Sequence, residues 1–423
     1  MAAEVITIGS EILAGHTVEA NLVPIVRAFA VEGVRVARHV VVPDERSAVG
    51  EALRLALGRN RVVITTGGLG ATPDDLTRGV IASLLGRKLT LRESLLAEIR
   101  SRHAARGRVM SPAAEVMALL PAGAHALANR VGLAPGFHLE IEGRHLFALP
   151  GVSAEMRAML SEEVIPRLRH AGLGAPRPTH LLRVVGIPET ALAQEVQPLL
   201  GERVTVAYLP CAGRVDVRLN AADDPPAQRA LTETLERLRE RLGALVYAVG
   251  EESLEAQVLA LLAERALSVA VAESLTGGLL GGALTRVPGS SRVFLGDVVA
   301  YSNAAKETLL GVSHRVLQHQ GAASAATAQA MALGARRGLG ASVGVATTGI
   351  AGPTGGSPEK PVGLVYFGLS ERRRQRSFRY LLGGSREMIQ DVSVTLALNT
   401  LRLHLLERLD LLAPHEERVA GLS

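Results

Sequence analysis

The sequence predicts an α/β protein in which two three-layer α/β/α domains flank a small α+β domain. The chain has 423 residues, which is more than one hydrophobic core usually serves. Its first and last thirds each alternate apolar strand-like runs with helical patterns, as βαβ units do. The stretch AGLGAPRP at residues 171–178 is rich in glycine and proline, which is typical of a domain boundary. We therefore expect domains at residues 1–171, 172–249 and 250–423.

The composition is that of a globular protein with aliphatic cores. Apolar residues make up 48% of the chain and aromatic residues only 3%, so alanine, leucine and valine must fill the cores. The net charge of +5 is small beside 46 basic and 41 acidic residues, and we expect no nucleic-acid partner. Cys211 is the only cysteine, which excludes a disulfide framework and a cysteine zinc site. We find no leader sequence and no apolar run of about 18 residues, so we expect a cytoplasmic protein without a membrane partner.

The elements of the first domain follow from its apolar runs. Short aliphatic and β-branched runs predict strands, and apolar residues spaced by three or four positions predict helices. Strands are expected at Val5–Gly9, Val34–Val42, Val62–Thr66, His138–Ile141 and His145–Leu149, and helices at Ala20–Glu32, Ser47–Gly58 and Ser153–His170. The loop GGLGATPDD follows the third strand, and open α/β sheets bind ligands at the carboxyl ends of their strands.

The same patterns predict the other two domains. In the middle domain we expect strands at Leu181–Val185 and on both sides of Cys211, with helices at Glu189–Leu200 and Pro226–Leu242; Leu245–Gly250 closes the domain. In the last domain we expect strands at Ser268–Ala272, Phe294–Ser302, Val343–Thr347, Gly363–Leu369 and Ser377–Leu382, with helices at Leu254–Arg265, Thr276–Thr285, Ser324–Gly338 and Arg386–Glu407.

Lysine is rare in this chain, which makes Lys306 informative. Only Lys88, Lys306 and Lys360 are lysines among 46 basic residues. Arginine does not lose its proton in a protein, whereas the pKa of a buried lysine can fall toward neutrality and let it act as a base. Lys306 lies shortly after Tyr301 and downstream of Ser274, which suggests a base, a helper and a nucleophile. A surface lysine, a core tyrosine and a capping serine would also explain the pattern.

Ser274 is expected on a strand-to-helix turn. The backbone amides of Thr276, Gly277 and Gly278 would lie at the start of the helix, where amides can hold an oxyanion or a phosphate. The reaction implied is acyl transfer without a metal, in which the serine attacks a carbonyl and Lys306 takes and returns the proton. This chemistry requires the pKa of Lys306 to fall from about 10.4 to nearer 7. A purely capping role for Ser274 is the alternative.

The loop TTGIAGPTGGSPEKPVG at residues 347–363 follows a predicted buried strand. It lacks the Gly-Lys-Ser/Thr of a P-loop, so we expect it to shape a pocket or to bind phosphate through backbone amides. The candidates for contact with a phosphate-bearing ligand are Thr348, Gly349, Ala351, Gly352 and Arg386. A plain surface loop would explain these residues as well.

Four motifs in the last domain resemble the C-terminal domain of the CinA family: AESLTGG, PGSSRVF, YSNAAKETLLGV and GIAGPTGGSPEKPVG. The resemblance implies hydrolysis of the amide of nicotinamide mononucleotide to nicotinate mononucleotide and ammonia, in pyridine nucleotide salvage and without a cofactor. The family's nucleophile falls on Ser274, and its tyrosine and lysine partners fall on Tyr301 and Lys306. Asp297 departs from the glycine of the family motif.

Four motifs in the first domain resemble the N-terminal domain of this family, which is related to molybdopterin-binding proteins: IGSEILAGHTVEAN, TTGGLGATPDD, NRVGLAPGF and LPGVSAEM. The resemblance implies cleavage of the pyrophosphate of ADP-ribose with a divalent metal such as Mg, Mn or Co. Phosphate contacts and metal ligands are then expected from a glycine-rich loop and hard carboxylate oxygens, at Gly67, Gly68, Gly70, Asp74, Asp75 and Glu11. Asp74 could instead cap the following helix. Ser10 and Ala71 depart from the aspartate and the proline of the relatives.

The resemblance also implies a KH-like fold for the middle domain. This domain lacks the GXXG loop with which KH domains clamp nucleic acid, so a spacer or dimer-forming role is simpler, and we expect a homodimer. Two other classes of function stay open. One is a module that binds molybdopterin or a nucleotide in the first domain without turning it over. The other is a competence or DNA-repair adaptor, which would bind DNA in a salt-sensitive manner.

Overall fold

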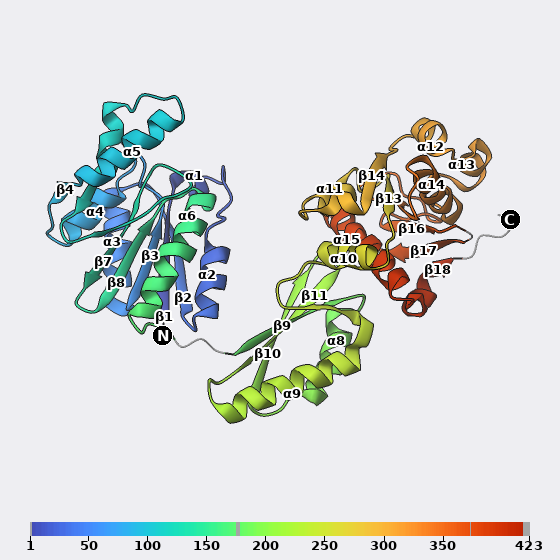
Figure 1. Cartoon of the computed structure of the whole chain (residues 1–423), viewed down its shortest axis with the longest axis horizontal. Helices are drawn as coiled ribbons and strands as arrows, with labels where there is room; N and C mark the ends of the chain where they lie inside the picture. The colour runs from blue at the N-terminus through green and yellow to red at the C-terminus, as the bar shows by residue number, and fades with distance from the viewer. Residues whose placement is uncertain (1, 175–177, 373, 418–423) are drawn as a thin grey trace. The chain divides into compact units, whose positions relative to one another are not determined.

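The structure is a computed structural model that describes residues 2–174, 178–372 and 374–417 (Figure 1). The chain divides into two compact units, Met1–Arg177 and Pro178–Ser423. The first unit contains one α/β domain, and the second contains the small α+β domain and the other α/β domain, which confirms the predicted fold class. Among the described residues, no helix combines the length and the apolar character needed to cross a bilayer.

The first unit is built on a six-stranded sheet in the order β2-β1-β3-β8-β7-β6. Its strands are β1 Ala2–Ile8, β2 Arg35–Val42, β3 Val62–Thr66, β6 His125–Leu127, β7 Gly136–Ile141 and β8 Arg144–Leu149. β2, β1, β3 and β8 run parallel, whereas β7 and β6 add antiparallel strands at one edge. The strands that the sequence predicts at His138–Ile141 and His145–Leu149 are present as β7 and β8, which pair antiparallel as a hairpin.

Helices cover both faces of this sheet (Figure 1). The helices are α1 Ser10–Leu13, α2 Leu22–Val31, α3 Arg46–Arg59, α4 Thr77–Leu84, α5 Glu93–Ala105, α6 Ser153–Met159 and α7 Ile165–His170, with a π-helical turn η2 Leu160–Val164 between the last two. Successive side chains of a strand point to opposite faces, so Ile6 packs in one core with α3, α4 and α5, and Val5 packs in the other with α2, α6 and α7. The short elements η1 Pro112–Ala118, β4 Leu89–Leu91 and β5 Leu119–Pro121 complete the domain.

The small domain is an antiparallel sheet in the order β10-β11-β9-β12 with helices on one face. Its elements are β9 Thr179–Val185, α8 Glu189–Val196, η3 Gln197–Leu199, β10 Val204–Cys211, β11 Arg214–Ala221, α9 Pro225–Leu242, η4 Gly243–Leu245 and β12 Val246–Val249. The start of α9 follows from its sequence, because Asp224 accepts the amide of Ala227 and a proline occupies the first turn.

The last domain has a six-stranded sheet in the order β14-β13-β15-β16-β17-β18. The parallel strands are β13 Val269–Glu273, β14 Phe294–Val299 and β15 Val343–Gly349, and the antiparallel ones are β16 Leu364–Ser370, β17 Gln375–Leu381 and β18 Glu416–Glu417. One face carries α10 Leu254–Glu264, α11 Leu279–Thr285 and α15 Arg386–Leu405, and the other carries α12 Asn303–Leu310, α13 His314–Gln320 and α14 Ala325–Gly338 (Figure 1). The 3₁₀ turns η5 Ser290–Arg292 and η6 Leu409–His415 lie outside these layers.

Small residues let α14 lie close to this sheet. Val271 of β13 faces the core with α10, α11 and α15, whereas its neighbour Ala272 faces the core with α14. A Cβ atom on Gly344 or on Gly368 would lie 2.0 Å from a backbone carbonyl oxygen of α14. Glycine at both strand positions is therefore required by the close approach of the helix.

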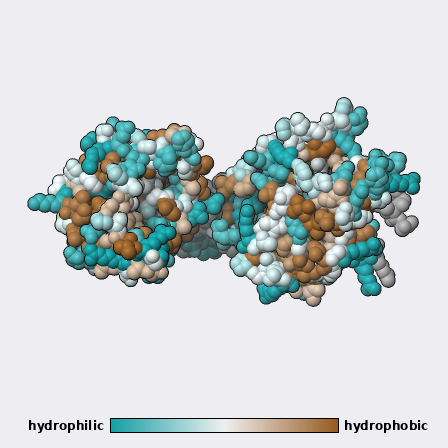
Figure 2. All heavy atoms as spheres, turned by 90° about the horizontal axis from the view of Figure 1, so that it is seen from above, coloured by the Kyte–Doolittle hydropathy of each residue, from teal (hydrophilic) through white to brown (hydrophobic). Residues whose placement is uncertain are grey.

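The surface mixes polar and apolar residues. On the face drawn in Figure 2, hydrophilic and hydrophobic atoms alternate over both units. Scattered apolar residues of this kind are normal for a globular protein, because polar groups are too few to cover the whole surface.

Candidate active site

Ser274 and Lys306 lie in direct contact at the carboxyl end of β13. The Nζ atom of Lys306 is 3.0 Å from the Oγ atom of Ser274. Ser274 follows β13 directly, and Lys306 lies in the first turns of α12, whose N-terminus is capped by Ser302. Both side chains are buried, with 8% of Ser274 and 1% of Lys306 exposed. The fold thus brings together two residues that are distant in the sequence and that we predicted as nucleophile and base.

The environment of Lys306 shifts its amine toward the neutral form. Besides Ser274, the amine donates to the carbonyl oxygen of Ala300 at 2.8 Å and to that of Tyr301 at 3.1 Å. Burial lowers the pKa of Lys306 from 10.5 to about 8, and no carboxylate of the described residues counters this effect. A neutral amine has two hydrogens and one lone pair. The two carbonyls can take the hydrogens, which leaves the lone pair to accept the proton of Ser274.

The turn at residues 275–278 separates Ser274 from α11, which begins at Leu279 and not at Thr276 as the sequence predicts. Gly277 and Gly278 have φ of +60° and +99°, a left-handed conformation that cannot continue a right-handed helix. The amide of Gly278 donates to Glu273 and is not available to a ligand. The amides of Thr276 and Gly277 have no acceptor within the described residues, so they can serve a developing oxyanion.

Tyr301 reaches the site through its backbone. Its carbonyl contacts Lys306, whereas its ring is 63% exposed and its hydroxyl accepts a hydrogen bond from Arg386 at 2.9 Å. Arg386 also donates to the carbonyl oxygen of Gly352 at 2.7 Å. These contacts bring Tyr301, Arg386 and Gly352 together beside the serine and lysine pair. The hydroxyl of Tyr301 has no contact with Ser274 or Lys306 among the described residues, so a direct proton relay is not seen.

Other residues of the predicted phosphate loop are held inside the fold. Thr348 is 1% exposed, and its hydroxyl donates to the carbonyl oxygen of Ala322 at 2.7 Å. Gly349 pairs with β16, where a Cβ atom would lie 2.5 Å from the carbonyl oxygen of Leu364, and Ala351 is buried. In this conformation these residues support the site from inside the fold.

Several residues around the site were not singled out by the sequence. Glu273 is fully buried and accepts the amides of Gly278 at 2.9 Å and Gly281 at 2.7 Å. Gln390 of α15 donates to the carbonyl oxygen of Leu275 at 2.7 Å. The one available signal was that Glu273 places a carboxylate at the end of a strand that is otherwise apolar.

The first unit has a separate cavity of about 670 Å³ near the carboxyl ends of β1 and β3. Its lining includes all six residues predicted there, Glu11, Gly67, Gly68, Gly70, Asp74 and Asp75. It adds Asp44, Arg106 and Glu155, which the sequence did not single out. Carboxylates thus dominate the charged groups around this cavity.

Asp75 holds the glycine-rich loop. Its Oδ1 atom accepts the amide of Gly70 at 2.6 Å, and its Oδ2 atom accepts the amide and the hydroxyl of Thr72 at 2.8 Å and 2.6 Å. Arg78 of α4, which is 3% exposed, donates to the carbonyl oxygens of Leu69 and Gly70. Asp75 and Arg78 therefore fix the loop between Leu69 and Thr72.

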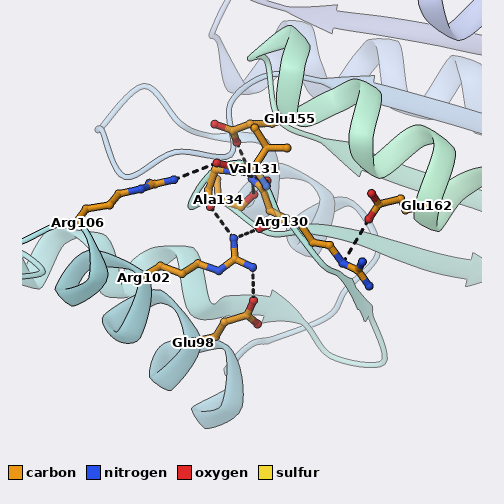
Figure 3. A network of polar contacts seen from close by, with 10 residues as sticks. Glu98, Arg102, Arg106, Arg130, Val131, Ala134, Glu155 and Glu162 are labelled. Atoms are coloured by element: carbon orange, nitrogen blue, oxygen red, sulfur yellow. Dashed lines mark hydrogen bonds and ion pairs between the residues drawn. The ribbon is translucent and has the colours of Figure 1, made fainter.

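Another wall of this cavity is formed by Val131, Gly132, Leu133 and Ala134, in the segment shown in Figure 3. Arg102 of α5 donates to the carbonyl oxygens of Asn129 and Gly132, and Arg106 donates to that of Val131 at 3.0 Å. Asn129 in turn donates to Glu155 of α6 at 2.6 Å. Two helices on opposite sides therefore hold this wall.

The donor set of the cavity suits a metal only in part. Within the described ranges, no three side chains of His, Cys, Asp or Glu come close enough together to hold a metal ion. Asp75 is engaged with the loop, whereas Glu11 and Asp74 line the cavity. The nearby Thr72 hydroxyl and its own backbone amide lower the pKa of Asp74, so Asp74 is ionised at neutral pH. Two carboxylates completed by water and substrate phosphates are a usual set for Mg²⁺.

Comparisons with known proteins agree across the whole chain. The domain described as "CinA C-terminal domain" matches residues 251–405, "Damage-inducible protein CinA KH domain" matches residues 179–248, and "Probable molybdopterin binding domain" matches residues 4–170. A "CinA-like protein" of Gemmatimonas aurantiaca is 41% identical over 407 residues, which cover 94% of this chain and 95% of the relative. A "CinA-like protein" of Syntrophotalea carbinolica is 41% identical over 404 residues, which cover 95% and 98%.

Among solved structures, the competence/damage inducible protein CihA of Agrobacterium tumefaciens is 42% identical to this chain. It covers 36% of this chain and 93% of its own, with a TM-score of 0.35. Because relatives at 41% identity extend over nearly the whole length, the chain belongs to the CinA family.

Proposed function

We propose that the last domain hydrolyses the carboxamide of nicotinamide mononucleotide to nicotinate mononucleotide and ammonia. The observation that supports this most is the 3.0 Å contact between the amine of Lys306 and the hydroxyl of Ser274 in a buried setting. A lysine with a pKa of about 8 is close to the range that a general base needs. The family resemblance supplies the substrate, and the geometry supplies the two groups that the reaction needs.

The steps follow from these contacts. Lys306 takes the proton of Ser274 as the Oγ atom attacks the carboxamide carbon, and the amides of Thr276 and Gly277 stabilise the oxyanion. Lys306 then gives the proton to the leaving nitrogen, which departs as ammonia and leaves an ester on Ser274. A water molecule, deprotonated by Lys306, attacks this ester, and Lys306 returns that proton to the Oγ atom of Ser274 as the C–O bond breaks. The acid product then ionises to nicotinate mononucleotide. Arg386 holds the Tyr301 hydroxyl at the rim, where both groups can contact the nucleotide.

Ammonia release from nicotinamide mononucleotide in the presence of a chelator tests this function. We expect the full chain to release ammonia, and Ser274→Ala to lose it while still binding the nucleotide, as measured by calorimetry. If Ser274→Ala and the unaltered chain release ammonia equally fast, Ser274 is not the nucleophile. If the unaltered chain binds nucleotide but never releases ammonia, the protein is a binding module.

We propose a second activity for the first unit, the metal-dependent cleavage of the ADP-ribose pyrophosphate. The observation that favours it is the excess of carboxylates around the 670 Å³ cavity, which would repel a pyrophosphate unless a divalent cation lay between them. Glu11 and Asp74 would hold such a cation, which when bound would neutralise the phosphate charge and activate water. Within the loop, the amides of Gly67 and Gly70 already donate to Leu149 and Asp75, so the amides of Gly68 and Leu69 would hold and orient the pyrophosphate.

Cleavage of ADP-ribose with and without added Mg²⁺, Mn²⁺ or Co²⁺ tests the second activity. We expect cleavage with metal, none with chelator, and unchanged ammonia release by the last domain in both cases. Binding of ADP-ribose without cleavage under every metal condition would instead support a first domain that only binds its ligand.

A further inference from the structure

Two carboxylates lie on the same face of neighbouring strands behind the catalytic turn. Glu273 ends β13, and Asp297 lies in β14, where it pairs with Val271. Residues two apart on a strand share a face, so Glu273 and Val271 point to the same side as Asp297. That side carries α11, because a Cβ atom on Gly281 would lie 2.6 Å from the Oδ2 atom of Asp297. The carboxyl group of Asp297 therefore sits over the first turn of α11.

The two carboxylates differ in their hydrogen bonds. Glu273 is fully buried, and its two oxygens accept the amides of Gly278 and Gly281. The Oδ1 atom of Asp297 is also buried, but it has no hydrogen-bond partner among the described residues. A buried, unpaired carboxylate oxygen next to another carboxylate is costly in the ionised form, and the cost is avoided when one of the pair keeps a proton.

We propose that Asp297 is a protonated acid that donates a hydrogen bond to Glu273 and thereby fixes the turn that carries Ser274. Asp297 is then a positioning residue, because it acts on the reaction through Glu273 and the amides of Gly278 and Gly281. The effect on turnover rests on the proposed deamidation, whereas the shared proton itself does not.

The charged groups around the pair are consistent with one retained proton. Burial, followed by the charge of Glu273, raises the pKa of Asp297 to about 8. The helix α11 that packs over Asp297 has the sequence LLGGALT and brings no titratable side chain. In η5, which also packs on β14, the guanidinium of Arg292 lies over Gly289. The amine of Lys306 on α12 is engaged with Ser274 and two carbonyls.

The shared proton predicts a decline of deamidation at alkaline pH. Activity first rises with pH as Lys306 becomes neutral. Above the pKa of Asp297, a second negative charge appears beside Glu273, which repels it and loosens its hold on the amides of α11. Turnover then falls. The dependence of kcat on pH therefore has a rising limb set by Lys306 and a falling limb set by Asp297.

Three variants of Asp297, assayed in the full chain, separate these effects. Asp297→Asn keeps a donor but cannot ionise, so we expect its kcat to keep rising above pH 8 to a plateau, whereas the unaltered chain loses at least about threefold from pH 8.5 to 9.5. Asp297→Ala loses the hydrogen-bond donor, so its kcat should be lower at every pH. The donor of Asp297→Asn should restore kcat. Asp297→Gly, which removes the carboxyl group, should also lack the alkaline limb. Identical alkaline limbs in the unaltered chain and in Asp297→Asn would overturn the proposal.

A second readout does not depend on catalysis. Because the pKa of Asp297 is raised by folding, the stability that its proton contributes is present at acid pH and is lost as pH rises from about 4 to about 8. The Tm of the unaltered chain should therefore fall relative to that of Asp297→Asn between pH 5 and 8. A Tm difference that is constant over this range would rule out the shared proton. If the Tm difference changes as expected but no ammonia is released, the proposed function fails and the shared proton stands.

Discussion

Replacement of Lys306 by arginine is the sharpest perturbation of the proposed chemistry. Arginine keeps the positive charge and a long side chain, but it cannot give up its proton in a protein. We expect Lys306→Arg to remain folded and to lose at least about 100-fold in kcat, since general base catalysis contributes 10²- to 10⁴-fold in typical enzymes.

The abundance of the neutral, reactive amine follows from the pKa of Lys306. A fall from 10.5 to about 8 corresponds to roughly 3 kcal/mol in favour of the neutral amine. At pH 7, about one lysine in ten is then neutral, against about one in 3,000 for an unperturbed lysine. The buried position therefore makes the reactive form about 300 times more abundant, and kcat should rise close to tenfold per pH unit below pH 7.5.

Ammonia release from nicotinamide mononucleotide, measured from pH 6 to 8, checks both the loss of kcat in Lys306→Arg and the rise of kcat with pH in the unaltered chain. Lys88→Arg is the matched control, because Lys88 is an exposed lysine of the first unit, and it should leave kcat unchanged. Thermal unfolding gives an independent check on the unaltered chain. The pKa of Lys306 is lowered by folding, so its buried charge costs stability below pH 8, and this cost should be relieved between pH 8 and 10.5. A Lys306→Arg variant with more than a tenth of normal kcat at neutral pH would refute its role as the base.

Three further predictions concern other parts of the chain. Arg386→Met removes the hydrogen bonds to Tyr301 and Gly352, so we expect KM for nicotinamide mononucleotide to rise about tenfold or more while the Tm changes little. A normal KM would show that neither Arg386 nor Tyr301 contacts the substrate. Gly368→Ala forces a Cβ atom to within 2.0 Å of the carbonyl oxygen of Ala328, so the free energy of unfolding should drop by about 1–3 kcal/mol in denaturant titrations, whereas Gly338→Ala, which meets no atom within 4 Å, should cause no loss. Asp74→Asn should abolish ADP-ribose cleavage at fixed Mg²⁺ without changing ammonia release. Asp75→Ala should abolish ADP-ribose cleavage by freeing the loop amides of Gly70 and Thr72. Cleavage that survives in Asp74→Asn would exclude Asp74 as a metal ligand.

The sequence predicts most strands and the long helices, because each has a clear apolar pattern. The pattern fails where backbone conformation decides the outcome, as at α11, whose start is delayed by the left-handed Gly277 and Gly278. The region between residues 77 and 135 has no assigned element. Its strands β4, β5 and β6 have too few residues to show a period, but the helices α4 and α5 were missed as well.

The candidate site was predictable to a different degree. Composition and motifs singled out Ser274 and Lys306, and the fold joins them. The sequence does not show which side-chain atoms a residue uses, and Tyr301 contacts Lys306 by its carbonyl while its hydroxyl faces Arg386. Glu273 and Asp297 could not be paired in advance, because their contact depends on the register of two strands joined through a helix and a long loop.

The most direct test of the serine and lysine mechanism is to look for the ester on Ser274. The full chain would be mixed with nicotinamide mononucleotide, quenched in acid within a turnover, and digested for peptide mass spectrometry. We predict that the nicotinate mononucleotide acyl group is found on the peptide with Ser274, and that Lys306→Arg does not form it. Steady ammonia release with no adduct on Ser274, or with the adduct on another residue, would contradict this mechanism.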